Sequence, residues 1–135
     1  MLQPKIIQKK MQKRKIKGYE TKIISLIFGS IGIKSVENKR IKSNQLEAIR
    51  NMILKKTKKF GQFWFRFFPW QTITKKPIET RMGKGKSFHS YWCSPVKAGR
   101  ILLEFYGISN IFIYEIFKLI KNKLPLHIKL IKVSH

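Results

Sequence analysis

The residues most able to do chemistry gather in one stretch, Glu79-Thr-Arg-Met-Gly-Lys-Gly-Lys86. Glycine lets a backbone approach a phosphate closely, lysine supplies diffuse positive charge, and arginine adds a planar fork for phosphate or guanine. Residues 75–90 also contain Pro77, and a loop this long inside a small domain is usually functional or disordered. We therefore predict a basic loop that binds RNA, with a plain solvated turn as the alternative. Its candidate residues are Lys75, Lys76, Arg81, Met82, Gly83, Lys84, Gly85 and Lys86.

Enzyme motifs are weak in this chain. Gly85-Lys86-Ser87 imitates the end of a nucleotide-binding P-loop, but Thr80 stands where the first glycine is required. His89 and Cys93 have the spacing of two metal ligands without a second pair, and a lone cysteine excludes an internal disulfide. General acid–base catalysis needs paired groups, which six scattered Glu do not offer. We expect no enzyme activity, no metal and no cofactor.

Charge and apolar content together indicate a packed but extremely basic protein. Its 135 residues carry 30 Lys plus Arg against 6 acids, a formal net charge of +24, and 43% of them are hydrophobic. Full disorder requires low hydrophobicity beside high charge, so a folded body is expected. Self-repulsion at this charge is relieved by a bound polyanion, which favours nucleic acid as the partner.

The N-terminal segment is predicted to be a basic arm over residues 1–20, ahead of a single domain over residues 21–135. It lacks a clean hydrophobic period and has no acid before Glu20, which is typical of a segment that becomes ordered on a phosphate backbone. A solvated tail is the alternative. Its candidate RNA-binding residues are Lys5, Lys9, Lys10, Lys13, Arg14, Lys15 and Lys17.

The first half of the domain is predicted to hold two strands and a helix. β-Branched residues over 23–28, followed by glycines, indicate a strand and a turn, and residues 31–36 pair with this strand or extend it. Ser43 or Asn44 begins a helix to about residue 58, whose buried stripe is Leu46, Ile49 and Ile53. The cations of its last turn suit both the helix dipole and RNA. They are Lys55, Lys56, Lys58 and Lys59.

Alternation over residues 62–68 predicts a strand with Phe63, Phe65 and Phe67 in the core. Its other face mixes aromatic rings with Arg66, which could stack on bases or pack under the arm. We expect a short strand at 72–74, a hairpin of strands 91–97 and 100–106 with Glu104 facing outward, a helix over 109–123 capped by Ser109, and a last strand over 126–133. The fold class is then α+β, with two helices packed on a largely antiparallel sheet as a sandwich.

Membrane insertion is not expected. The longest uncharged stretches run from Ile23 to Ile33 and from Phe105 to Tyr114, short of the roughly 18 apolar residues that cross a bilayer. A basic protein held on an anionic membrane surface is the alternative function, although the arm has no regular apolar face.

Seven segments resemble, in order and spacing, the bacterial-type large-subunit ribosomal protein sixteen family. The Arg-Met-Gly-Lys-Gly-Lys loop with the Gly-Arg-Ile-Leu strand is the most specific part. The segments are Met1-Leu-Gln-Pro-Lys5, Gln45-Leu-Glu-Ala-Ile-Arg50, Phe67-Phe-Pro69, Pro77-Ile-Glu-Thr-Arg-Met-Gly-Lys-Gly-Lys86, Tyr91-Trp92, Val96-Lys-Ala-Gly-Arg-Ile-Leu-Leu-Glu104 and Lys123-Leu-Pro125.

The resemblance implies an α+β sandwich bound to large-subunit rRNA beside the A-site tRNA, with the Arg81 loop extending toward the peptidyl transferase centre. It also implies late assembly of the large subunit, neighbouring ribosomal proteins as partners and no homo-oligomer. The sequence departs from the family pattern at Ser87, where Gly is usual, at Ser90, where an acid is usual, at Lys42, where Thr is usual, and at Trp70-Gln71-Thr72, where Asp-Lys-Pro is usual.

The second helix also departs from the family, because it is bulky and apolar over residues 111–116 where the family is rich in Ala and Glu. This favours an added protein neighbour or drifted packing. Lysine and isoleucine bias, together with an N-terminus that does not read as a targeting segment, favours a mitochondrially encoded protein in the mitochondrial matrix. Bacterial cytoplasm and plastid stroma are the alternatives.

Overall fold

The computed structural model describes residues 4, 10–57 and 61–133. Within them, two helices accompany two antiparallel sheets, one with strand order β3-β6-β1-β7 and one with order β2-β5-β4. The α+β class with two helices is thus confirmed, with its strands divided between two sheets. The elements are β1 (Ile31–Ser35), β2 (Lys39–Lys42), α1 (Ser43–Thr57), β3 (Gln62–Phe65), β4 (Gln71–Thr74), β5 (His89–Val96), β6 (Ile101–Tyr106), α2 (Asn110–Lys123) and β7 (Ile128–Lys132).

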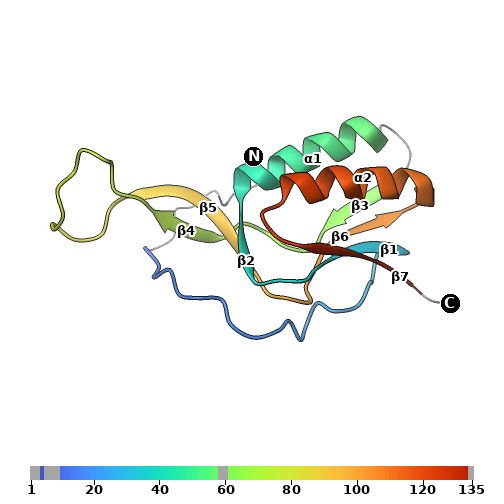
Figure 1. Ribbon diagram of the computed structural model, residues 1–135, viewed down its shortest axis with the longest axis horizontal. Coiled ribbons are helices and arrows are strands. Elements are labelled where there is room, and N and C mark those ends of the chain that lie inside the picture. The colour runs from blue at the N-terminus through green and yellow to red at the C-terminus, as the bar shows by residue number, and fades with distance from the viewer. Residues whose placement is uncertain (1–3, 5–9, 58–60, 134–135) are drawn as a thin grey trace.

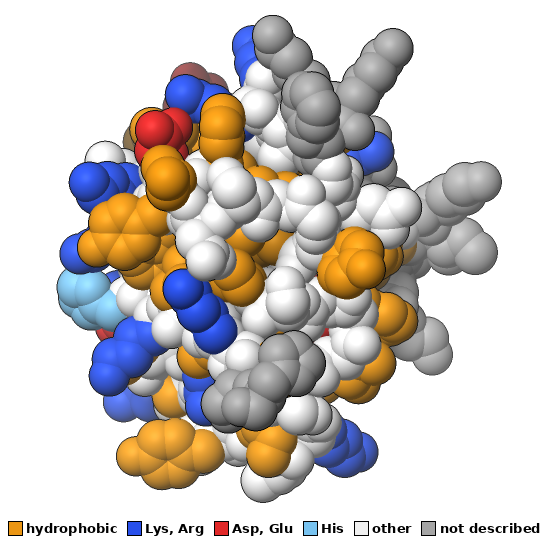
Figure 2. Space-filling view, turned by 90° about the vertical axis from the view of Figure 1, so that its right-hand side faces the viewer, with side chains coloured by type: hydrophobic (Ala, Val, Ile, Leu, Met, Phe, Trp, Pro, Cys, Tyr) orange, Lys and Arg blue, Asp and Glu red, His pale blue; other side chains and the backbone are white. Residues whose placement is uncertain are grey.

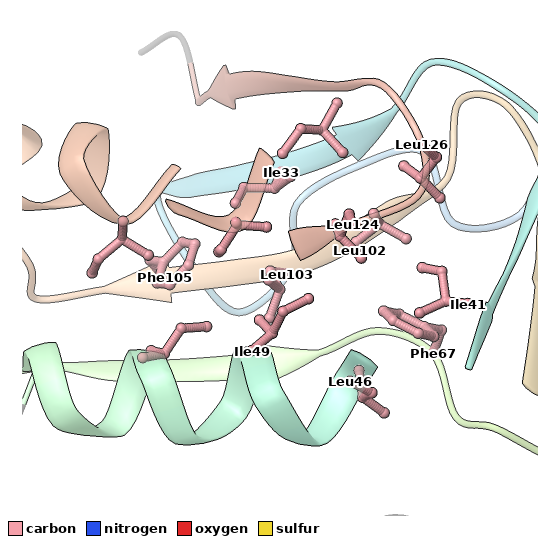
Figure 3. Packing of buried hydrophobic residues seen from close by; sticks show 14 of the residues in the cluster. Ile33, Ile41, Leu46, Ile49, Phe67, Leu102, Leu103, Phe105, Leu124 and Leu126 are labelled. Carbon is pink, nitrogen blue, oxygen red and sulfur yellow. The ribbon is translucent and has the colours of Figure 1, made fainter. Parts of the chain in front are cut away.

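Both helices lie side by side on one face of the four-stranded sheet, and the N-terminal segment runs along the opposite side (Figure 1). Leu46, Ile49 and Ile53 of α1 are buried, which confirms the predicted stripe. Figure 3 shows Ile49 of α1 facing Leu103 of β6, and both belong to one buried cluster with Leu46, Phe67 and Phe105. The core therefore fills the space between the helices and the larger sheet.

Each helix begins where the sequence predicts. In neither case, within the described residues, does a serine side chain provide the expected capping hydrogen bond at the helix N-terminus. At α1 the Gln45 side chain accepts the Lys42 backbone N–H at 3.0 Å, which satisfies a donor at the helix start as the returning half of a capping box does. Ser109 precedes α2 in an extended conformation, but its side chain makes no capping hydrogen bond. The Leu124 N–H donates to the Ile120 carbonyl and ends α2 before Pro125.

The strand predicted over residues 23–28 is wrong. These residues form an irregular segment, because the Ile27, Phe28 and Gly29 backbone N–H groups donate to the Glu104 carboxylate at 3.1, 2.6 and 2.9 Å instead of to a strand. Gly29 marks a close approach rather than only a turn, since a Cβ there would collide with the Phe105 backbone. A buried acid thus directs this part of the backbone.

The predicted hairpin of residues 91–97 and 100–106 is also wrong. Strand β5 pairs with β2 and β4, while β6 pairs with β1 and β3. Both edges of each strand are occupied, so neither has hydrogen-bonding groups left for the other. The chain passes between the sheets at Gly99, whose φ is +91°. Glu104, predicted to face outward, is fully buried.

The remaining differences concern the end of one strand and one strand that was not predicted. The strand predicted over 62–68 stops at Phe65, although Phe67 continues into the core as predicted and Phe63 and Phe65 pack against it. Strand β2 was not expected at all. Among the described residues, neither helix combines the length and apolarity that a bilayer-crossing segment requires.

Candidate nucleic-acid interface

The basic loop projects from the β4–β5 pair of the small sheet and forms the far end of the molecule (Figure 1). Its apolar side chains are exposed as well as its charged ones, with Ile78 at 97% and Met82 at 98% of full exposure. Arg81, Lys84 and Lys86 are also exposed. The loop therefore presents both its charged and its apolar side chains to the surroundings of the protein.

The loop has a defined course despite its exposure. Gly83, Lys84 and Gly85 have φ values of +103°, +57° and +78°, so the tip turns through three consecutive left-handed residues, and the two glycines relieve the strain of such a turn. Lys76 Nζ donates to the Gly83 carbonyl at 2.5 Å, and Ser87 Oγ donates to the Lys75 carbonyl at 2.9 Å. Ser87, a departure from the family pattern, therefore closes the base of the loop.

The arm and the loop, separate in the sequence, meet in the fold. Lys10 Nζ donates to the Lys86 carbonyl at 2.8 Å and lies 5.2 Å from the centre of the Phe88 ring. Lys86 Nζ in turn donates to the Met11 carbonyl. The described part of the arm thus extends the basic loop into one longer basic surface. Lys5 and Lys9 lie outside the described residues.

Farther along the arm, an open hollow of about 410 Å³ lies between the arm and the small sheet. Lys13 and Lys15 line it from the arm. Opposite them stand Lys39, Arg40 and Lys42 of β2, which sequence reasoning missed. The sequence signal for them was the basic run Lys39-Arg-Ile-Lys42. It could be related to the arm only after the fold had placed β2 beside the arm.

Three further contacts hold the residues around this hollow. The Arg40 guanidinium donates to the Arg14 carbonyl, and its Nε donates to Gln71 Oε1 at 3.3 Å. Lys42 Nζ lies 5.1 Å from the centre of the Tyr91 ring. Since Arg14, Lys15 and Lys17 remain exposed, the arm presents its cations outward while its backbone is held.

The cations of α1 form a separate group. Lys55 and Lys56 lie in the last turn, where they line an open hollow together with Met52 and with Lys123 of α2. This end of α1 points away from the basic loop (Figure 1), so these residues do not join the arm and loop surface. Lys58 and Lys59 lie outside the described residues.

The Arg66 side chain is largely buried. Its guanidinium pairs with Glu104, and the two side chains are 12% and 0% exposed. Burial raises the pKa of Glu104, but hydrogen bonds from Gly29, Phe28, Ile27 and Arg66 outweigh it, and the pKa is lowered overall. Together with the hydrogen bonds from residues 27–29, the pair holds this segment against the sheet.

The described cysteine and Glu37 have shifted pKa values that burial and hydrogen bonding explain. Burial raises the pKa of the Cys93 thiol, which disfavours the nucleophilic thiolate. The pKa of Glu37 is lowered chiefly by the His127 backbone N–H, which donates to it at 2.6 Å. Within the described ranges, no three His, Cys, Asp or Glu side chains come together in a group that could hold a metal ion.

The surface at the other end of the molecule is mixed in character. Figure 2 shows the end of the molecule opposite the basic loop, where apolar side chains lie among Lys and Arg side chains and acidic ones are visible at few points. On α2, Ile111, Phe112 and Tyr114 are more than half exposed. What the described interface can do chemically is bind anions through many cations and a few rings.

Residues 4–131 match the sequence profile of the family described as ribosomal protein L16p/L10e. A large ribosomal subunit protein uL16m of Prototheca wickerhamii is 40% identical over 135 residues, which cover 99% of this chain and 100% of that protein. A large ribosomal subunit protein uL16 of Psychrobacter arcticus is 41% identical over 133 residues, covering 98% of this chain and 97% of the other.

Proposed function

The chain belongs to the ribosomal protein L16p/L10e family, and we propose that it serves as a structural constituent of the large ribosomal subunit that binds large-subunit rRNA. The observation that carries this is the joining of the arm and the basic loop through Lys10 and Lys86. A continuous surface of cations with exposed loop side chains fits a long phosphate backbone better than a small ligand.

The mechanism is electrostatic. Lysine and arginine neutralise phosphates and release condensed counterions, so binding weakens steeply as salt rises. The folded body contributes register, because the small sheet aims the loop and the Arg40 contact holds the arm. Cations that only neutralise charge carry little sequence information. Specificity therefore comes from the shape of the surface.

Within the subunit, the loop is the part we assign to the neighbourhood of the A-site tRNA and the peptidyl transferase centre. Arg81, Lys84 and Lys86 are exposed at the end of a projection of the small sheet, which gives them reach into a crowded RNA environment. The arm then threads between rRNA helices, and the protein joins late in assembly. Lys55 and Lys56 would meet a different part of the rRNA, because they lie at the other end of the molecule.

The partners in this proposal are large-subunit rRNA, A-site tRNA and neighbouring large-subunit proteins, with no membrane insertion and no homo-oligomer. The mitochondrial ribosome is the proposed location, supported by the 40% identity to a mitochondrial-type relative. The comparably similar bacterial relative keeps a bacterial or plastid ribosome as the alternative. Catalysis is not part of the proposed role.

Sedimentation tests the proposal directly. A lysate washed at high salt is separated on a sucrose gradient, and this protein is followed by mass spectrometry. We expect it with the large subunit after the wash. Recovery at the top of the gradient would overturn the ribosomal role, and recovery with membranes would instead support the peripheral membrane protein.

A further inference from the structure

A third hollow, separate from the loop and the arm cations, lies on the surface where β3 leads into β4. It is open, measures about 570 Å³ and is lined mainly by aromatic rings and arginines. We call it the aromatic hollow and define it by Phe28, Arg66, Phe68, Trp70 and Arg100. Neither the loop nor the arm cations described above reach into its lining.

Three of its rings face outward. Phe28 is 53% exposed, Phe68 is 46% exposed and Trp70 is 41% exposed. The chain around Pro69 produces this arrangement, because Phe67 enters the core while the residues on either side of Pro69 turn out. Large exposed rings gathered at one place mark a binding surface more often than a packing accident.

Phe28 arrives from a distant part of the sequence and is held firmly. Its backbone N–H donates to the buried Glu104 carboxylate at 2.6 Å, and its ring lies 5.1 Å from the Arg66 guanidinium and 5.7 Å from the Trp64 ring. The hollow is thus assembled from three segments of the chain, around Phe28, Phe68 and Arg100, before any ligand arrives. A preorganised surface loses less conformational entropy on binding than a flexible one.

The arginines of the hollow supply hydrogen-bond donors. Both Arg66 and Arg100 line it, and each also pairs with a carboxylate, Arg66 with Glu104 and Arg100 with Glu20. Arg100 pairs with Glu20 at 3.7 Å and donates to the Arg66 carbonyl at 3.2 Å, while its Nε is buried with no hydrogen-bond partner in the described part of the chain. An occupant that brings both a flat ring and hydrogen-bond acceptors matches these features.

We propose that the aromatic hollow holds an unpaired nucleobase of the bound RNA. This inference rests on the proposed function, since it takes rRNA as the partner. Single-stranded RNA is recognised by stacking unpaired bases on aromatic rings and arginine planes. Trp70 and Phe68 provide the stacking faces, and Arg100, whose Nε has no hydrogen-bond partner among the described residues, supplies a donor for the polar edge of the base. Double-helical RNA cannot enter, because its bases are already stacked.

The test separates stacking from charge. Affinity of the full-length protein for a short oligouridylate is measured over a range of salt, and log affinity is plotted against log salt. The slope counts phosphate contacts, whereas a stacking contact shifts the whole line. We expect Trp70→Ala to lower affinity about 5- to 150-fold at every salt with the slope unchanged. Trp70→Phe, which keeps a ring, should retain most of the affinity.

Phe112→Ala is the matched control, because Phe112 is a 51% exposed ring on α2 outside the hollow, and it should leave the line in place. Thermal unfolding of each variant shows whether it is folded, and Phe68→Ala replaces Trp70→Ala if the latter is not.

Salt-dependent binding that is identical in wild type, Trp70→Ala and Phe68→Ala would overturn the proposal that the aromatic hollow binds a nucleobase. It would leave the proposed rRNA-binding role intact. Loss of a neighbouring protein from purified subunits, with RNA affinity unchanged, would likewise overturn the nucleobase proposal in favour of a protein ligand. Failure of the wild-type protein to bind RNA at any salt would overturn the proposed function itself.

Discussion

The Glu104 carboxylate on β6 accepts the backbone N–H of Phe28 at 2.6 Å across 76 positions of sequence. The same carboxylate accepts the two neighbouring N–H groups and pairs with Arg66. One buried acid therefore fixes the N-terminal segment against the outer side of the larger sheet. Because the carboxylate, the guanidinium and three amides satisfy one another, removal of any member leaves buried groups without partners.

Glu104→Gln should destabilise the free protein by about 3–5 kcal/mol, the range seen when a buried ion pair loses one partner. The amide is neutral and leaves Arg66 with an uncompensated charge at 12% exposure. Urea unfolding followed by tryptophan fluorescence measures this. Glu115→Gln, on the exposed face of α2, serves as the control and should change stability by about 0.5 kcal/mol or less. Equal effects of the two variants would show that the Glu104 cluster does not hold the fold.

Stability should also fall in acid because of the same residue. The pKa of Glu104 is lower in the folded protein than its ordinary value, so the folded state holds the carboxylate charged more tightly than the unfolded state does. This contribution is fully present above about pH 4.3, the ordinary value for Glu, and is lost as pH falls through the lower folded value. Urea midpoints measured at a series of acidic pH values should therefore drop less steeply for Glu104→Gln than for wild type. Parallel curves would count against the assignment.

Two glycines should respond differently to substitution by alanine. At Gly29 a Cβ would meet the Phe105 backbone, which cannot move aside cheaply, whereas at Gly83 nothing lies within 4 Å. Gly29→Ala should cost about 1–3 kcal/mol through overpacking. Gly83→Ala carries only the strain of its φ of +103° and should alter the loop rather than global stability. Thermal unfolding of the two variants compares them, and a larger loss at Gly83 would contradict the packing argument.

The arm should account for a measurable part of the salt dependence of RNA binding. Lys13→Gln with Lys15→Gln removes two cations that line the hollow beside β2, and the log–log slope should decrease by up to about 1.8 if each contacts a duplex phosphate. Affinity for large-subunit rRNA is measured by filter binding at several salt concentrations. Lys118→Gln with Lys121→Gln on α2 removes the same charge elsewhere. An equal decrease in both double variants would mean that only net charge matters.

Arg81→Ala should reduce translation more than it reduces assembly. Arg81 is exposed on the projecting loop and the structure gives it no packing role, so the variant protein should fold and enter subunits. Incorporation is measured by sedimentation, and elongation by the rate of peptide synthesis on purified ribosomes. Lys118→Ala, a cation change on α2, is the control. Normal elongation with the substituted protein incorporated would refute a role for Arg81 near the tRNA.

Local patterns were enough to predict the helices and the class of partner. The spacing of Leu46, Ile49 and Ile53 specifies one face of α1 regardless of what covers it, and the stripe of α2 behaves in the same way. Net charge is a sum over residues and needs no fold. The basic loop could also be located from Pro77 and its glycines, since their conformational limits are local.

Strand pairing could not be predicted in this way, because a strand is completed by partners distant in sequence. Residues 91–106 contain two strands in the predicted places, yet β5 and β6 enter different sheets because β2, β4, β1 and β3 occupy their edges. The strand expected over residues 23–28 was lost to Glu104, whose alternating position suggested a surface residue. The alternation of residues within one strand does not show whether another segment of the chain covers its polar face, as residues 27–29 cover Glu104.

The sequence by itself determined that this chain is a basic, folded α+β protein with an arm and a glycine-containing loop, since composition, helical period and turn residues are properties of short stretches. Only the tertiary structure decided which cations act together. In the fold, Lys10 donates to the Lys86 carbonyl, and Lys13 lies across a hollow from Arg40. Arg66 instead pairs with the buried Glu104. The fold also gathered Phe28, Phe68 and Trp70 at one hollow. The physical reason is that contacts between distant segments depend on which sheet edges and buried charges pair with one another in the whole fold, and no local pattern contains that information.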